Sequence, residues 1–578
     1  GDFSMDAAVA VTMDEETGAA DVAKSISDLI DKSLITLQAG KGPVQFRLLD
    51  ITRSYAAMKL CASGDERQVR LRHADFYRRR MRDYTRRDKP AADAGENANR
   101  LEQDIRNLRI ALGWAFSDTG DGEIAAEISA LAVPVLVDQL MLKECREYCR
   151  RALANLPQTL FDTAIELALQ EGFAISACSI ATAEDEVRLA LQRGLELARK
   201  QKSTRHELHL MAGLNLLMLK SGEFRQALDM AESYAAEAAA HGRPHELRAA
   251  SWMLGTAHYY VGNQDAAEAN YLDNPIHHAA SGASGLGYFE NNHHLIASVL
   301  QARVAWTRGQ PAKSIRLAAK AIENCKSSPT SLCTCLLLGI PVFLLCGQLD
   351  RAARLLDELQ SLIKRYSFDV HRDAAIALQG ELTLLRGKAE QAIEILQGVT
   401  LATPITSPHL WVSDASRALA ESFAQCGEYD DAISIIDAAL ERTDSRGGSY
   451  NLATLLRTKA EILLHLPEPD IENVEVLLDR AIAVSRLQSS LGYELPVVLT
   501  LTQLREMQGR EDEAIMLLKA TVDRFTDGFE TSDLKRSKQI LGLHRRTHQS
   551  NARNLPEITA LNSRDGQGRD RLAGSAGR

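Results

Sequence analysis

The sequence predicts a mainly α-helical protein, a solenoid of stacked helical hairpins that follows a small domain containing both helices and strands. Two observations predict the solenoid. Residues 418–440 read as two short helices around Gly427, with Ala432 five residues later inside the second helix. Glycine reaches the left-handed conformation that ends many helices, and a small side chain lets two helices pack closely. The second observation is that this glycine and small-residue pattern recurs along the chain.

The recurrence has a period near 40 residues. Successive glycines are separated by 40, 47, 38, 40, 40 and 82 residues, and the last interval is two steps of 41. The pairs are Gly222/Ala227, Gly262/Ala267, Gly309/Ser314, Gly347/Ala352, Gly387/Ala392, Gly427/Ala432 and Gly509/Ala514. A copy without the glycine is expected near Pro467. Single hairpins cannot bury their apolar faces alone, so we expect them to stack into an α-α superhelix; unrelated hairpins are the alternative.

The junction at Gly427 resembles that of a tetratricopeptide repeat (TPR), with Ala420 and Phe423 at the small and aromatic positions of the first helix. The resemblance implies a TPR-like surface that binds a protein partner or a small-molecule effector. Self-association through the same surface is a further alternative.

Composition narrows the class of protein. The net charge of −10 excludes a general binder of polyanions. The nine cysteines include no CxxC pair, so we interpret them as buried thiols in a reducing cytoplasm rather than metal ligands. The uncharged run at residues 327–348 contains Pro341 and has Gly347 in repeat register. It therefore predicts a buried solenoid helix and no membrane span.

Residues 1–60 are expected to form the small domain. A helix with Ile26, Leu29 and Ile30 on one face precedes two strands around a Gly-Lys-Gly-Pro turn, and another helix starts near Ile51. This order is the outline of a winged-helix domain.

The same segment resembles the winged helix of STAND-type (NB-ARC-like) signal-transduction ATPases. The residues that carry the resemblance are Asp31, Lys32, Ser33, Leu34, Arg47, Leu48, Leu49, Thr52, Arg53, Tyr55, Ala56, Arg72, His73, Ala74 and Tyr77. The resemblance implies a lid that senses nucleotide, within a bacterial transcriptional regulator; a DNA-reading role for the winged helix is the alternative. The sequence contains no GxxxxGK[ST] phosphate loop, so we expect any ATPase domain, like any DNA-binding domain, to lie upstream of Gly1.

The remaining boundaries follow from composition and pattern. Residues 61–120 are expected to be a helical connector, with an arginine-rich helix that we interpret as a solvated face rather than a phosphate contact. Residues 121–545 are expected to form the repeat solenoid, with Leu140 where later copies carry glycine. Residues 546–578 are polar and glycine-rich and are expected to be disordered.

The long interval between Gly262 and Gly309 predicts an inserted loop that contains His277, His278, His293 and His294. Four histidines suggest a metal or ligand site, but no cysteine or carboxylate falls at ligand spacing. We therefore interpret the loop as a candidate effector contact.

No catalytic motif is present, and we expect neither enzymatic activity nor a cofactor in this chain. The sequence favours the regulatory sensor module of a signal-transduction ATPase. A plain TPR scaffold and the non-catalytic half of a nucleotide-cyclase-type signalling protein are the alternatives.

Overall fold

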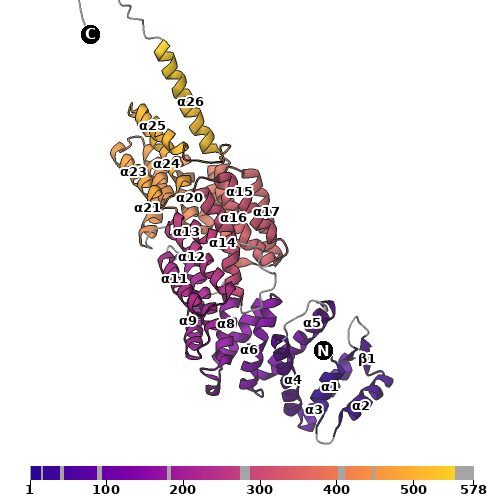
Figure 1. The fold of residues 1–578 in the computed structure, drawn as a ribbon. Coiled ribbons are helices and arrows are strands. Elements are labelled where there is room, and N and C mark those ends of the chain that lie inside the picture. Colours follow the sequence, from indigo (N-terminus) through magenta and orange to yellow (C-terminus); the bar gives the residue numbers. More distant parts are fainter. Residues whose placement is uncertain are drawn as a thin grey trace, which may run out of the picture.

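The computed structural model describes residues 2–14, 17–38, 44–86, 94–178, 184–273, 287–366, 368–400, 411–445 and 450–553. Over these residues the prediction of a mainly α-helical, TPR-like solenoid is confirmed. The small N-terminal unit lies at one end of the molecule, and the last helix projects from the other end (Figure 1). His277, His278 and residues 554–578 lie outside the described residues. Residues 546–553, the start of the expected disordered tail, belong to the last helix instead.

The N-terminal unit contains a two-stranded sheet and three helices. Its elements are α1 (Met5–Thr12), α2 (Ala19–Asp31), β1 (Ile35–Gln38), β2 (Gln45–Leu48) and α3 (Asp50–Ser63). The strands are antiparallel, with Ile35 opposite Leu48. Val22, Ile26, Ile35 and Phe46 form a small separate core. This element order agrees with the expected one, while the winged-helix assignment stays a prediction.

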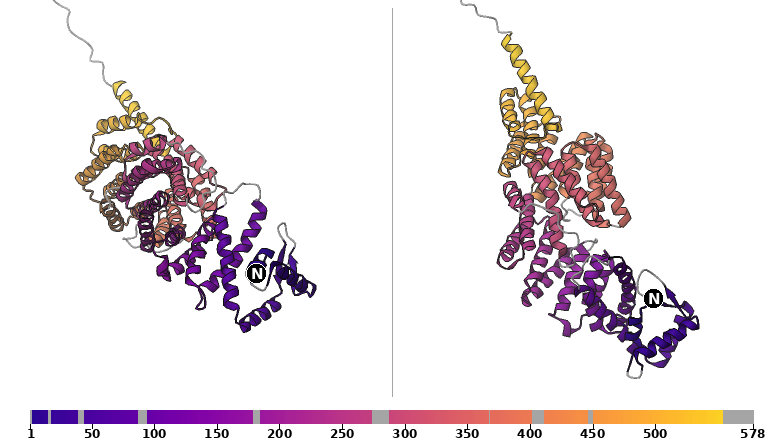
Figure 2. Two further views of the ribbon diagram at one scale, coloured as in Figure 1. Left: turned by 60° about the horizontal axis from the view of Figure 1, so that its bottom comes forward. Right: turned by 45° about the vertical axis from the view of Figure 1, so that its right-hand side comes forward.

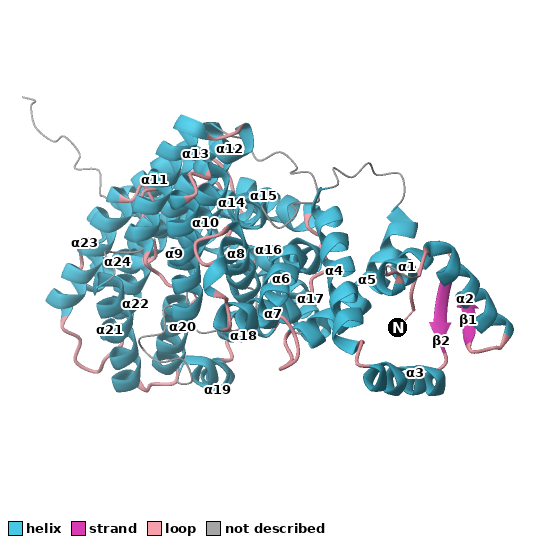
Figure 3. Ribbon diagram, turned by 90° about the horizontal axis from the view of Figure 1, so that it is seen from below, coloured by secondary structure: helices cyan, strands magenta, loops and turns pink. Residues whose placement is uncertain are grey.

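Helix α3 stands apart from this core (Figure 3). None of its residues is buried. Its apolar side chains Ile51, Tyr55 and Met58 are exposed on one helical face.

Two helices, α4 (Glu66–Arg86) and α5 (Ala94–Ala115), connect the unit to the solenoid. The first hairpin of the solenoid is α6 (Gly122–Asp138) and α7 (Leu142–Ala154). The arginine-rich helix α4 buries one face, with Ala74, Tyr77 and Met81 in the core. Two of its arginines form ion pairs with other helices, Arg78 with Glu127 at 2.5 Å and Arg80 with Asp104 at 2.9 Å. One face of the helix is therefore packed, and the interpretation of its other face as solvated stays a prediction.

The following helices form consecutive hairpins. The first group is α8 (Ala164–Cys178), α9 (Glu184–Lys200), α10 (Thr204–Lys220), α11 (Phe224–His241), α12 (Pro244–Val261), α13 (Gln264–Asp273), α14 (Tyr288–Thr307), α15 (Pro311–Asn324), α16 (Pro329–Leu345) and α17 (Leu349–Tyr366). The second group is α18 (Arg372–Leu385), α19 (Ala389–Thr400), α20 (Val412–Gln425), α21 (Tyr429–Ser445), α22 (Leu452–Leu464), α23 (Ile471–Leu487), α24 (Leu491–Met507), α25 (Glu511–Val522) and α26 (Ser532–Arg553). No helix in these described ranges is both long and apolar enough to cross a bilayer.

The repeat glycines lie at the corners inside the hairpins. Gly222, Gly262, Gly309, Gly347, Gly387, Gly427 and Gly509 have φ values between +67° and +89°. The small residue five positions later is buried in every copy: Ala227, Ala267, Ser314, Ala352, Ala392, Ala432 and Ala514. The α22–α23 corner, near Pro467, has no glycine. Leu140, with φ +56°, takes the glycine position of the α6–α7 corner.

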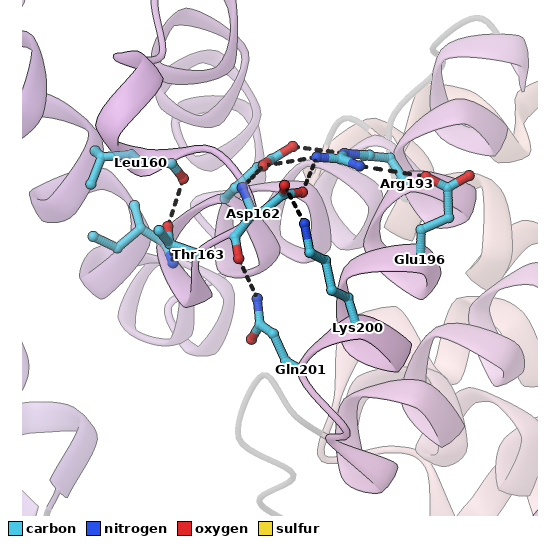
Figure 4. Close-up of polar contacts among 9 residues, drawn as sticks. Leu160, Asp162, Thr163, Arg193, Glu196, Lys200 and Gln201 are labelled. Carbon is cyan, nitrogen blue, oxygen red and sulfur yellow. Dashed lines mark hydrogen bonds and ion pairs between the residues drawn. The ribbon is translucent and has the colours of Figure 1, made fainter.

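A polar network connects helix α9 with the turn that precedes helix α8 (Figure 4). Asp162, itself left-handed with φ +63°, accepts hydrogen bonds from Arg193 at 2.9 Å and Lys200 at 2.5 Å. The buried Glu166 accepts from Arg193 and from the Asp162 amide. The Asp162 carbonyl accepts a bond from Gln201. These contacts fix the angle between two neighbouring helices.

The hairpins form two layers. The first helix of each hairpin from α12 to α24 (the even-numbered helices) packs on the first helix of the next hairpin. The second helix of each hairpin contacts mainly first helices. The more closely spaced layer must lie on the inside of the curve, and the helices curl around a common axis (Figure 2). The curl brings α14 into contact with α24.

Candidate functional site

The inner face of the second half of the solenoid carries a line of alternating charges, which we name the charge ladder: Glu381 on α18, Arg417 and Glu421 on α20, and Arg457 and Glu461 on α22. Arg417 bridges Glu381 and Glu421, the latter at 2.9 Å. Arg457 lies 3.7 Å from Glu421 and 2.6 Å from Glu461. Glu381 and Glu421 are thus each joined to the next hairpin through an arginine.

Hydroxyl groups complete the ladder. Thr458 donates to Glu421 at 2.8 Å, and Thr500 on α24 donates to Glu461 at 2.6 Å. The ladder side chains are between 12% and 29% exposed. They therefore line the inner surface and are partly exposed to solvent rather than sealed in the core.

The ladder carboxylates differ in their electrostatics. Burial raises the pKa of Glu381 despite the neighbouring Arg417 guanidinium. Burial acts in the same direction on Glu421, but Arg417 and Arg457 outweigh it, so the pKa of Glu421 is lowered. The end of the ladder on α18 is therefore more easily protonated than its middle.

A second group of contacts closes the curl, and we name it the seam. It joins Tyr259, Tyr260, Trp306, Arg308 and Ala312 to Tyr450, Ser489, Gly492, Tyr493 and Asp527. The Tyr450 amide donates to the Tyr260 carbonyl at 3.1 Å, and Arg308 donates to the Ser489 carbonyl at 3.3 Å. Trp306 and Tyr493 pack edge to face, with ring centroids 4.9 Å apart.

The buried Arg303 of α14 lies among the aromatic rings of the seam. Its guanidinium carbon is 5.5 Å from the ring centroid of Tyr259 and 5.3 Å from that of Tyr450. Tyr450 in turn donates to Asp414 at 2.7 Å. Cation–π contact stabilises the guanidinium, but its buried Nε has no hydrogen-bond partner among the described residues.

Two of the four histidines predicted to form an effector loop lie in a helix. His293 and His294 belong to α14 and are buried. His293 Nε2 lies 2.9 Å from the Ala212 carbonyl oxygen, and His294 packs against Trp252. The inserted loop is therefore shorter than expected, because α14 begins at Tyr288. An effector contact by the remaining loop stays a prediction.

Within the described part of the chain, no group of three or more His, Cys, Asp or Glu side chains could hold a metal ion. Six cysteines are buried, as free thiols: Cys145, Cys149, Cys325, Cys333, Cys335 and Cys346. Burial raises the pKa of Cys333 and of Cys346 to about 12, which keeps both thiols protonated.

The charge ladder was missed in the sequence, although a signal for it exists. Glu381, Glu421 and Glu461 are spaced by 40 residues, and Arg417 and Arg457 by the same interval. An acid or a base that recurs at the repeat period occupies the same place in each hairpin. The seam gives no such signal, because it joins different positions of different hairpins.

Corner glycines, buried small partners and stacked first helices define the class of protein as a TPR-like α-solenoid. No family model matches the chain. A stretch of 145 residues, 25% of this chain, is 30% identical to three curated mycobacterial proteins provisionally named HTH-type transcriptional regulators. They are Rv0890c and MT0914 of Mycobacterium tuberculosis and Mb0914c of Mycobacterium bovis, and the match spans only 16% of their length.

Two solved structures resemble the fold at low sequence identity. A Rap protein in complex with competence and sporulation factor aligns with 74% of this chain and 99% of its own, at 11% identity and a TM-score of 0.34. Yeast Tom70 aligns with 84% of this chain and 99% of its own, at 14% identity and a TM-score of 0.30.

Proposed function

We propose that this chain is a regulatory protein-interaction module that binds a polypeptide segment along the charge ladder. The observation that carries the proposal is the ladder itself, a row of charged groups held in place on the inner face yet partly open to solvent. Preorganised donors and acceptors lower the entropy cost of binding a flexible chain. Three acids alternate with two arginines, so a segment with both donors and acceptors is the matching partner.

We further propose that the module belongs to a cytoplasmic, bacterial transcriptional regulator. The partial identity to the mycobacterial proteins supports this proposal. The resemblance of residues 1–60 to the winged helix of STAND-type ATPases extends it. In the mechanism that we propose, a bound partner shifts the population of the solenoid toward one arrangement. Residues 1–60 then transmit this shift to an ATPase. Any DNA contact belongs to another part of the regulator.

The ladder is tested with a paired substitution on α22 and a matched control pair that includes another residue of α22. The double substitution Arg457→Gln and Glu461→Gln removes the charges of one ion pair of the ladder. The amide groups that replace them can still form hydrogen bonds. The control is Asp437→Asn with Lys459→Gln, which neutralises a pair of 2.7 Å between α21 and α22. Short peptides are selected from a random phage-displayed library on residues 1–578.

We expect the selected peptides to lose at least tenfold in affinity for the ladder variant and to bind the control variant as they bind the unmodified chain. Equal urea midpoints for the two variants would establish that the loss of peptide affinity does not come from a loss of folding stability. Equal affinity for all three proteins, or no enrichment of peptides at all, would exclude the ladder as the binding surface.

The regulatory part of the proposal has separate tests. Residues 1–578 should not bind ATP, because the sequence lacks a phosphate loop. Deleting residues 1–60 from the whole regulator should abolish its transcriptional response while peptide binding persists. A plain scaffold predicts an unchanged response, and tight ATP binding by this chain would contradict the assignment. The identity of the output domain distinguishes a regulator from a cyclase-type protein.

A further inference from the structure

Arg303 is a buried cation without an anionic partner. The residue is only 7% exposed. Its Nε is enclosed and has no hydrogen-bond partner, and no ion pair joins it to a carboxylate in the described ranges. Every other arginine discussed above that lines the inner face is paired, Arg417 and Arg457 in the ladder and Arg308 at the seam.

The surrounding tyrosines do not supply the missing charge. Burial raises the pKa of Tyr259, Tyr450 and Tyr493 and sets that of Tyr260 near 12, so all four are neutral at physiological pH. The nearby carboxylate of Asp414 accepts from Tyr450 and Asn451, both at 2.7 Å. Its two oxygens are thus occupied by neutral donors. An unpaired buried charge lowers the free energy of unfolding, and binding of an external anion would offset that loss.

We propose that Arg303 binds the carboxylate of a ligand at the seam, and that this ligand stabilises the closed solenoid. A planar guanidinium stacked on ring faces keeps its edge free for a bidentate, coplanar contact with a carboxylate. A single arginine next to the negative Asp414 suits a monoanion better than a phosphate dianion. The aromatic rings of Tyr259, Tyr450 and Trp306 favour a carboxylate attached to an apolar or aromatic body.

The ligand would act across the seam, because its neighbours come from both sides of it. Arg303 and Tyr259 belong to α14 and α12, whereas Tyr450 and Tyr493 belong to the far end of the curl. Binding at this point therefore couples ligand concentration to closure of the solenoid. The inference uses the seam alone and does not depend on the peptide-binding role of the charge ladder.

The test uses residues 1–578 and two small probes of the same shape, benzoate and its neutral isostere benzamide. We expect benzoate to raise the urea midpoint in a saturable way at constant ionic strength, and benzamide to have no effect. Protection of the Tyr450 amide against hydrogen exchange should rise with benzoate, because that amide bonds across the seam.

Substitution at Arg303 separates ligand binding from support of the fold. Arg303→Met removes an unpaired charge and keeps the volume, so without benzoate the variant should be at least as stable as the unmodified chain. It should also lose the response to benzoate. The control Arg308→Met removes a paired seam arginine; it should lower stability and retain the response.

The source of the carboxylate is read from a second pair of probes, an acetylated alanine tetrapeptide with a free carboxyl terminus and the same peptide with an amidated terminus. A stronger response to the free peptide than to benzoate assigns the ligand to a polypeptide end, and the reverse assigns it to a small acid. Equal effects of benzoate and benzamide would overturn the proposal. So would an unchanged benzoate response in Arg303→Met, or a loss of stability in that variant without any anion effect.

Discussion

Asp527 caps a helix that lies 215 residues before it in the chain. Its carboxylate accepts hydrogen bonds from the backbone amides of Ala312 at 2.9 Å and Lys313 at 3.1 Å, at the N-terminus of α15. A carboxylate at this end of a helix satisfies free amides and meets the positive end of the helix dipole. The solenoid is therefore closed by directional contacts as well as by apolar packing.

Replacing this distant cap should weaken the seam. We expect Asp527→Ala to lower the free energy of unfolding by about 1–2 kcal/mol, and to increase hydrogen exchange at the Ala312 and Lys313 amides. Asp523→Ala is the matched control, because Asp523 is an exposed residue of the same segment. A variant at Asp527 that exchanges as slowly as the control would show that the cap contributes nothing.

A methyl group at position 492 should weaken the seam at a different contact, the one between Gly492 and Trp306. A Cβ at this position would lie 2.6 Å from the Trp306 carbonyl oxygen, so Gly492→Ala is expected to cost about 1–3 kcal/mol through overpacking. Small-angle scattering should detect a larger radius of gyration. In contrast, Gly398→Ala in α19 has open space around it and should stabilise the chain by about 0.5–1 kcal/mol. Equal free energies of unfolding for the two variants would mean that the seam accommodates the methyl group without a loss of stability.

The buried pair His209–Glu290, 2.8 Å apart, predicts a pH-dependent stability. Burial favours neutral imidazole, but Glu290 outweighs it and raises the pKa of His209 above 6.5. The contribution of His209 is therefore complete below pH 6.5 and is lost as pH rises through the raised pKa. Burial likewise opposes ionisation of Glu290, yet His209 lowers its pKa below 4.5. Its contribution is present above pH 4.5 and is lost as pH falls through the lowered pKa.

The difference in urea midpoint between the unmodified chain and His209→Gln should consequently be largest between pH 4.5 and pH 6.5. His241→Gln removes a similar but exposed pair with Glu237 and should show no such maximum. A flat difference for His209→Gln across this range would argue that the pair is neutral throughout.

The cysteines predict a simple labelling pattern. Cys61 is exposed, whereas Cys333 and Cys346 are buried with raised pKa values. Iodoacetamide should therefore modify Cys61 within the native protein and reach the other two only after unfolding, because the thiolate is the reactive form. Mass spectrometry of tryptic peptides measures the order. Rapid native labelling of Cys333 would show that α16 opens readily.

The local part of the fold could be predicted, because the signals are local. A glycine with positive φ and a buried small residue five positions later mark each corner, as at Gly427 and Ala432. The long interval between Gly262 and Gly309 predicts a loop that includes His293; the residue lies in a helix instead and contacts Ala212, two hairpins earlier. The pairing of Asp527 with Ala312 could not be read from the sequence, since the curvature that joins them is a sum of small rotations between hairpins.

The seam has a consequence for how the chain acquires its structure. Repeat arrays usually fold quickly from contacts between neighbours in sequence. Here α14, which ends at Thr307, must wait until α24, which begins at Leu491, has left the ribosome before the final contacts form. A nascent chain that ends before Leu491 should therefore persist as an open spiral with Trp306 uncovered. That intermediate would be the species most exposed to chaperones and to aggregation.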